Sequence, residues 1–184
     1  SGMGTPGNFV LREEEMSAVL CKGSRWALEN GYATQADLDY TESNGCLPGA
    51  DPSRVSQRAR QRGKDQLGTI GSGNHFVEVG YVDRILQPDI ARAYGLFSGQ
   101  VTILIHTGSR GLGHQVATDY IRQMVSAMAG YDIKLPDREL ACVPFNSIEG
   151  QDYFAAMCAA ANFAWCNRQL VTWEVRQVWK NIFG

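Results

Sequence analysis

The sequence predicts an α+β fold, in which a mixed sheet is combined with several helices. Two short apolar runs, residues 75–82 and 101–105, have the alternation or the β-branched content that is typical of strands. Longer segments before and after these runs carry apolar residues at helical spacing. One clear strand–loop–helix unit is present, at residues 101–129, so the pattern favours α+β over a regular α/β winding.

The composition is that of an ordinary globular protein. A chain of 184 residues, of which 44% are hydrophobic and 20% charged, can bury a core as one domain. The formal net charge of −2 argues against bulk electrostatic capture of nucleic acid, and no DNA partner is expected. The net charge does not exclude a local basic patch on the surface.

The cysteines indicate the redox compartment of the protein, and the first residues indicate where its domain begins. Five cysteines without a C-x-x-C pair fit reduced thiols in a cytoplasmic protein. We expect no signal peptide and no membrane span. Ser1-Gly2-Met3 is similar to the remnant of a cloning tag, so residues 4–184 are expected to form the domain.

The first third of the chain is expected to combine helices with loops. Residues 11–30 have an amphipathic helical pattern, and Thr34 is a suitable N-cap for a short helix over residues 35–40. Asn44-Gly45 and Leu47-Pro48-Gly49 are turn signals and predict a loop.

A basic run without any acid follows this loop. Its members are Arg54, Arg58, Arg60, Arg62 and Lys64. Two interpretations stay open, because such a run forms either a solvated helix face or a surface that contacts the phosphate backbone of a nucleic acid.

Strand and helix signals alternate in the rest of the chain. The strands are expected over the two apolar runs named above, and a glycine-rich loop follows the second of them. Ser147 is a suitable N-cap for one of the later helices. The helices are expected over residues 85–94, 115–129, 149–167 and 171–183.

All three histidines lie in two glycine-rich segments beside the predicted strands. One segment is Gly68-Thr69-Ile70-Gly71-Ser72-Gly73-Asn74-His75, and the other is His106-Thr107-Gly108-Ser109-Arg110-Gly111-Leu112-Gly113-His114. Imidazole is a common metal ligand and proton carrier, while glycine lets backbone N–H groups close on an anion. The pairing therefore predicts a phosphate site, a metal site, or both.

The second segment has the order strand, glycine-rich turn, helix. This order leaves the free N–H groups of the first helical turn facing the loop, where they can bind an anion. Arg110 adds a planar fork that suits bidentate contact with phosphate. Glycine-rich turns also occur for tight geometry alone, and Arg110 with its neighbouring histidine favours the anion site.

The first segment places polar groups at the start of a strand. Alternation puts Asn74, Phe76 and Glu78 on one face, and His75 with Val77 on the other. One face would hold a base or sugar, and the other would offer an imidazole to a metal. The alternative is a structural His75, hydrogen-bonded to a loop carbonyl, and two histidines in matched settings favour the metal.

Both segments resemble signature motifs of the RtcB family. The resemblance continues in Gly49-Ala50-Asp51-Pro52-Ser53, in the basic run and in Ile148-Glu149-Gly150-Gln151-Asp152-Tyr153, so that it extends from about Glu13 to the C-terminus. The family comprises RNA ligases that depend on GTP and manganese. They join 2′,3′-cyclic phosphate or 3′-phosphate ends to 5′-hydroxyl ends.

The resemblance implies a role for each residue at a matching position. His75 and His106 would be manganese ligands, and Arg110 would meet an RNA phosphate together with Arg60 and Arg62. His114 matches a family position without an implied role. The guanylate site would be lined by Asn74, Phe76 and Glu78.

The chain differs from the family in extent. RtcB proteins are much longer, with an upstream Asp-x-x-Cys pair and a downstream histidine as further ligands and a later histidine that becomes guanylylated. The resemblance therefore implies a partial RtcB-like domain, the central part of the catalytic domain without its N-terminal and C-terminal portions. By the same resemblance, we expect no catalytic nucleophile within residues 4–184.

Three functional hypotheses follow. In the first, the chain is part of an RNA ligase whose remaining parts lie elsewhere or on a completing partner chain. In the second, it is an inactive derivative that binds nucleotide or RNA phosphate. In the third, it is a stable remnant whose exposed apolar surfaces serve homo-oligomerisation or another protein contact.

Overall fold

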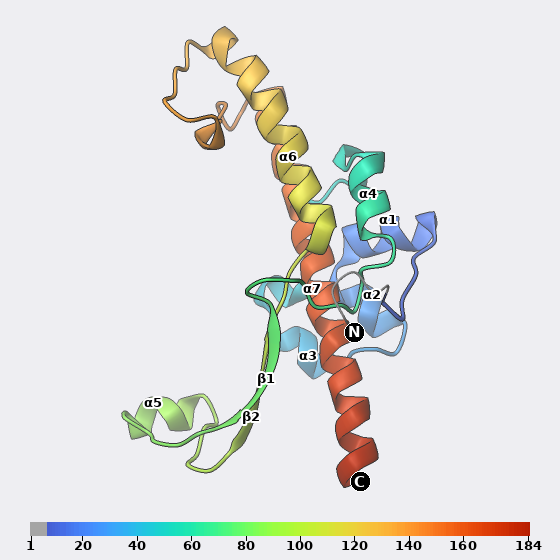
Figure 1. Cartoon of the computed structure of the whole chain (residues 1–184), viewed down its shortest axis with the longest axis vertical. Coiled ribbons are helices and arrows are strands. Elements are labelled where there is room, and N and C mark those ends of the chain that lie inside the picture. The colour runs from blue at the N-terminus through green and yellow to red at the C-terminus, as the bar shows by residue number, and fades with distance from the viewer. Residues whose placement is uncertain (1–6) are drawn as a thin grey trace.

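The computed structural model describes residues 7–184, and the expectation that Ser1-Gly2-Met3 is a tag remnant lies outside them. Within the described residues the α+β class is confirmed (Figure 1). The helices are α1 (Glu13–Lys22), α2 (Ser24–Glu29), α3 (Gln35–Asp39), α4 (Gln57–Gly63), α5 (Pro88–Ala93), α6 (Arg110–Ala127) and α7 (Ile148–Phe183). The strands are β1 (Phe76–Tyr81) and β2 (Val101–His106), and short 3₁₀ helices cover Glu42–Gly45, Pro52–Arg54, Met128–Tyr131 and Arg138–Leu140.

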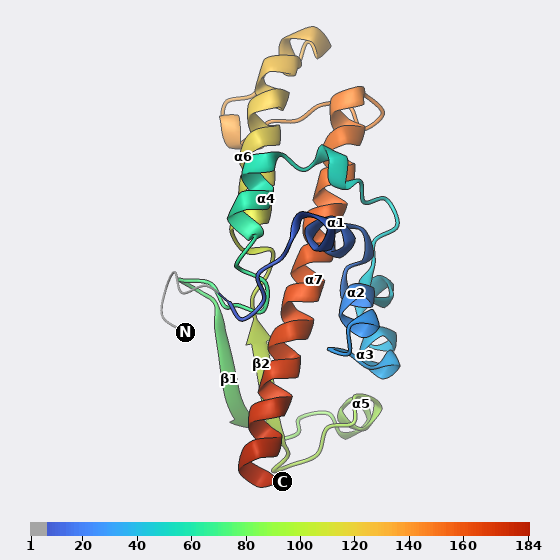
Figure 2. The same ribbon diagram turned by 90° about the vertical axis from the view of Figure 1, so that its right-hand side faces the viewer.

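Helix α7 forms the axis of the molecule. Figure 2 shows α2 and α3 along one side of α7, α1 in front of it, and the sheet beside its C-terminal half. Helix α6 runs antiparallel to the N-terminal half of α7 and packs against it (Figure 1). The core lies where these helices meet, and it includes the fully buried side chains of Leu20, Leu112, Phe163, Cys166 and Leu170.

The sheet consists of β1 and β2, paired antiparallel from Phe76 opposite His106 to Tyr81 opposite Val101. Both predicted strands are confirmed to within one residue at each end. The expected mixed sheet is wrong for the described residues, because the connection through α5 returns the chain beside β1 and the segments on either side are helical or irregular. The pair ends in a hydrogen bond from the Val82 N–H to the Gln100 carbonyl.

Two expected helices at the C-terminus are one continuous helix, α7, of 36 residues. The predicted gap, residues 168–170, contains Arg-Gln-Leu, which are good helix formers, and no glycine or proline. The predicted N-cap is confirmed, since Ser147 Oγ accepts a hydrogen bond from the Gly150 N–H at 3.1 Å. No helix within residues 7–184 has both the length and the apolar character that a membrane crossing requires.

The helix expected over residues 11–30 is divided in two at Gly23. This residue has φ 55° and ψ −132°, a conformation that an L side chain rarely adopts. A Cβ atom there would also collide with the carbonyl oxygen of Gly45. The close approach of the Glu42–Gly45 turn ends α1, although the apolar periodicity continues into α2.

Helix α6 begins at Arg110, five residues before the predicted start at Gln115. The glycine-rich segment therefore forms the first turns of the helix and is not an open loop. Two contacts stabilise this start. The Gly111 N–H donates to Gln66 Oε1 at 2.9 Å, and Leu112 is fully buried.

Asp37 ties α3 to α7. Its carboxylate accepts hydrogen bonds from Arg176 at 2.6 and 2.9 Å, and one from the Thr34 N–H at 2.8 Å. Thr34 Oγ1 accepts from the Asp37 N–H, which confirms the predicted N-cap. The Arg176 hydrogen bonds, followed by those of Thr34, hold the pKa of Asp37 well below its ordinary value.

We expect Asp37→Asn to lower the free energy of unfolding by about 1–2 kcal/mol near neutral pH, since Arg176 is half-exposed and partly solvated. The folded pKa of Asp37 lies below the value of about 3.9 in an unfolded chain. Its contribution is therefore complete above that value and is lost as pH falls through the folded pKa. Urea unfolding of both proteins should show a difference that narrows below about pH 4. A difference that is constant down to acid pH would contradict the assignment.

Candidate functional site

The structure brings two of the three histidines together at one end of the sheet. The first residue of β1, Phe76, pairs with the last residue of β2, His106. His75 directly precedes β1, and its ring centroid lies 5.9 Å from that of His106. Both imidazoles are exposed. The antiparallel register thus combines two distant turns into one pair of imidazoles.

The tautomer of His75 follows from its hydrogen bond. Its Nδ1 lies 2.7 Å from the carbonyl oxygen of Ser72. A carbonyl oxygen only accepts hydrogen bonds, so Nδ1 carries the proton in the neutral ring and Nε2 keeps a free lone pair. The bond is the loop-carbonyl contact expected of a structural histidine, and it is also the contact that orients a metal-binding imidazole.

The separation of the two imidazoles is compatible with the binding of one divalent ion by both rings. With metal–nitrogen bonds of about 2.1 Å, the centroids of two imidazoles on one ion lie roughly 5–6.5 Å apart. The observed 5.9 Å falls within this range. Within residues 7–184, no group of three or more His, Cys, Asp or Glu side chains is placed to hold a metal ion. The pair therefore supplies part of a coordination shell, and further ligands would have to complete it.

Arg110 and His75 approach each other at Gly71. A Cβ atom on Gly71 would lie 2.5 Å from Arg110 Nη1 and 2.7 Å from His75 Nδ1. A larger residue at this position would therefore displace the guanidinium or the imidazole. Arg110 Nε also donates to Thr69 Oγ1 at 2.9 Å, which fixes the direction of the side chain.

The charge of Arg110 is not neutralised by a neighbouring carboxylate. None of the ion pairs among the described residues includes it. The side chain is partly buried, and burial lowers the pKa of its guanidinium. Its backbone has φ 54°, a left-handed conformation that costs a non-glycine residue roughly 1–3 kcal/mol. A desolvated cation without a counter-ion favours the binding of an anion.

The basic run is divided between the interior and the surface. The Arg60 side chain is only 11% exposed, and it pairs with Glu13 and donates to Ser17 Oγ and to the Pro52 carbonyl. Its guanidinium is therefore engaged inside the fold. Arg62 lies elsewhere, beside the first turns of α6.

Arg62 is placed near the start of α6 by two polar contacts. Its Nη1 donates to Gln115 Oε1 at 3.1 Å and lies 3.5 Å from His114 Nδ1. A Cβ atom on Gly111 would lie 3.2 Å from Arg62 Nε. The third histidine is thus associated with Arg62, apart from the pair formed by His75 and His106.

The three residues expected to face guanylate lie next to the histidine pair. Phe76 is half-buried, and its ring meets that of His106 edge to face, with centroids 5.3 Å apart. Phe76 and Glu78 alternate onto the same face of β1, and both Glu78 and Asn74 are exposed. His75 lies before β1, so strand alternation does not determine the direction of its ring.

Asn167, to which no sequence motif pointed, contacts both histidine-bearing turns from α7. Its Oδ1 accepts from the Thr69 N–H at 3.0 Å, and its Nδ2 donates to the carbonyls of Thr69 at 3.0 Å and Gly108 at 2.9 Å. The next residue, Arg168, donates to the Thr107 carbonyl at 3.3 Å, and burial lowers the pKa of its guanidinium. The only signal in the sequence is a polar residue on the buried stripe of an apolar helix.

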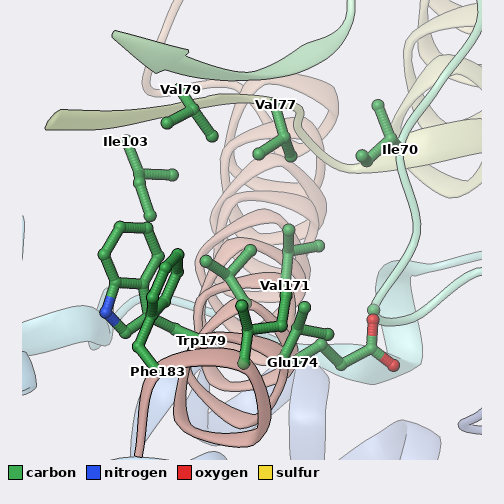
Figure 3. A pocket seen from close by; sticks show the side chains of 12 residues that line it. Ile70, Val77, Val79, Ile103, Val171, Glu174, Trp179 and Phe183 are labelled. Atoms are coloured by element: carbon green, nitrogen blue, oxygen red, sulfur yellow. The ribbon is translucent and has the colours of Figure 1, made fainter. Parts of the chain in front are cut away.

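An apolar groove of about 540 Å³ lies between the sheet and the C-terminal half of α7. Figure 3 shows Val77, Val79 and Ile103 pointing from the sheet toward Trp179 and Phe183 of α7. Its lining contains one charged side chain, that of Glu174. A groove without cationic or N–H donor side chains other than the Trp179 indole does not suit phosphate.

Comparisons with known proteins agree with this arrangement of motifs. The family described as tRNA-splicing ligase RtcB matches residues 1–184. A tRNA-splicing ligase RtcB from Thermococcus kodakarensis is 55% identical over 183 residues, and one from Archaeoglobus fulgidus is 51% identical over 184 residues. Each alignment covers all of this chain and 38% of the relative. One from Pyrococcus horikoshii is 56% identical over 183 residues, which is 21% of its length. The expected resemblance is confirmed, and the chain belongs to the RtcB family.

Proposed function

We propose that this chain is the central part of the catalytic domain of an RtcB-type RNA ligase. In this proposal residues 4–184 form one domain, which acts in the cytoplasm on RNA ends that carry a 3′-phosphate or a 2′,3′-cyclic phosphate, and on 5′-hydroxyl ends. The observation that carries the proposal is that His75 lies beside both His106 and, at Gly71, Arg110.

His75 and His106 would hold manganese as two of its ligands. The Ser72 carbonyl keeps the proton of His75 on Nδ1, so that Nε2 is free to bind the ion. A bound divalent ion supplies Lewis-acid polarisation of phosphoryl oxygens. The pair alone is a weak site, because a Mn²⁺ ion needs more ligands than two imidazoles.

Arg110 would bind an RNA phosphate. Its guanidinium is held by Thr69, lacks a carboxylate partner among residues 7–184 and lies beside His75. A planar fork in this position can make two parallel hydrogen bonds to phosphate oxygens. Arg62 would add positive charge near the start of α6, whereas the internal contacts of Arg60 restrict it to supporting α4.

Asn74, Phe76 and Glu78 would face the guanylate. Phe76 offers an aromatic edge beside His106, and Glu78 offers an exposed carboxylate on the same strand face. A carboxylate accepts hydrogen bonds from base N–H groups and from ribose hydroxyls, while an amide such as that of Asn74 both donates and accepts. The three side chains thus provide the polar and aromatic contacts that a GTP-derived nucleotide requires.

The complete ligase would need parts from outside residues 1–184. The chain spans 38% of the length of two of the relatives above, and two imidazoles do not complete a metal shell. A longer chain or a completing partner would supply the remaining ligands and the guanylylated histidine. The second candidate function is that of an inactive nucleotide- or RNA-phosphate-binding or oligomerising protein, and the exposed apolar groove favours the oligomerising form.

We expect no covalent guanylate on the isolated chain. Incubation with manganese and GTP labelled in the α-phosphate, followed by denaturing electrophoresis, measures the adduct directly. Neither proposed histidine ligand is free to act as a nucleotidyl acceptor while it binds metal. An acid-labile, base-stable phosphoramidate on the chain would show that it contains the nucleophile, contrary to the proposal.

We expect Arg110→Gln to weaken binding of a short RNA with a 3′-phosphate by roughly tenfold or more, because a charged hydrogen bond is worth about 1.5–3 kcal/mol. The dependence of log affinity on log salt should also become shallower by about one phosphate contact. Fluorescence titration at several salt concentrations measures both quantities.

The matched control is Arg58→Gln, which removes an exposed arginine of the same basic run. This variant should change affinity much less than Arg110→Gln. Equal losses for the two variants would indicate diffuse electrostatic binding and contradict the specific role of Arg110.

A further inference from the structure

We infer that Asn167 is a positioning residue that sets the separation of the imidazoles of His75 and His106. The inference rests on the proposed function, since it concerns how the same two side chains are presented to a metal. It assigns to α7 a role in the site, although α7 contributes no residue to the histidine pair.

The Asn167 side chain acts as a backbone partner for the first turn. Its carboxamide accepts from the N–H and donates to the C=O of Thr69, at 3.0 Å each, as the neighbouring peptide of a sheet would. Thr69 in turn holds Arg110, whose Nε donates to Thr69 Oγ1. The segment that leads through Gly71 to His75 is therefore anchored to α7 at Thr69.

The same amide anchors the second turn. The other proton of Nδ2 is directed to the Gly108 carbonyl at 2.9 Å, and Nδ2 also lies 3.4 Å from Thr107 Oγ1. Thr107 Oγ1 donates to the Thr69 carbonyl at 3.2 Å. Thr107 directly follows His106, so both histidine-bearing segments converge on one amide group.

Burial makes this connection rigid. Asn167 is fully buried, and Thr69 and Thr107 are buried as well. Removal of the amide leaves the Thr69 and Gly108 carbonyls without this buried partner, so the segments that carry them are no longer held at one distance. Outer hydrogen-bond partners of metal ligands typically change metal affinity by about 10–100-fold when they are removed.

Asn162 provides a matched control on the same helix. It is also fully buried, and its amide contacts the Leu20 and Cys21 carbonyls and both the N–H and the C=O of Leu47. These partners belong to α1 and to the loop that follows the Glu42–Gly45 turn. Loss of either asparagine removes a comparable set of buried hydrogen bonds. Only the set made by Asn167 involves the segments that carry His75 and His106.

The test uses the three histidines as reporters. Protein labelled with ¹³C in histidine gives ring signals from His75, His106 and His114 alone, and nuclear Overhauser effects between the first two report their contact. This contact should be present in the wild type and in Asn162→Ala, and it should be lost in Asn167→Ala. Titration with Mn²⁺ alone should broaden His75 and His106 with one midpoint, and Asn167→Ala should raise that midpoint by roughly tenfold.

Two results would overturn the inference. In one, the contact between His75 and His106 survives in folded Asn167→Ala, and in the other it is lost equally in Asn162→Ala. Where Asn167→Ala does not fold, Asn167→Ser keeps a smaller donor and is compared with Asn162→Ser in the same way. Failure of the proposed function gives a different result. Mn²⁺ would then leave the His75 and His106 signals of the wild type unbroadened, whereas the nuclear Overhauser effect between the two rings would still test the role of Asn167.

Discussion

The architecture depends on one constraint, which is that irregular segments must find hydrogen-bond partners on helix α7. The turns around residues 46–47 and 68–69 and the segment at 107–108 have backbone groups that the short sheet does not satisfy. Asn162 and Asn167 provide those partners from the buried stripe of α7. A polar side chain in such a place is stabilising only when all its partners are present, so the two asparagines specify where the segments dock.

Much of the fold could be predicted from local patterns. The strands, the Thr34 and Ser147 caps and the helical character of the last third follow from periodicity and capping chemistry, which act within a few residues. The break at Gly23 and the early start of α6 could not be predicted, because they result from contacts with Gly45 and Gln66 that are distant in the sequence. The continuity of α7 was missed for a different reason, since a change in the apolar pattern is not a helix breaker.

The candidate site divides in the same way. Residue type and glycine spacing pointed to His75, His106 and Arg110, and the structure places His75 next to each of the other two. Their mutual distances could not be predicted, because they depend on the register of β1 and β2 and on the anchoring of both turns to α7. Arg60 illustrates the opposite case, since charge alone suggested a surface role and the fold surrounds its guanidinium with internal acceptors. A charged residue in a sequence shows which groups it can bind, whereas its burial in the fold determines whether its partners are internal or external.

The two-stranded sheet has a consequence for how the protein loses its structure. A lone antiparallel pair is marginally stable in water, and here an open apolar groove separates part of its inner face from α7. Local opening of β1 and β2 would separate the two imidazoles while the helical core stays folded. A thermal melt followed by helical circular dichroism would then report on the core and miss the site. Amide exchange along Phe76–Tyr81 and Val101–His106 is the observable that follows the integrity of the histidine pair.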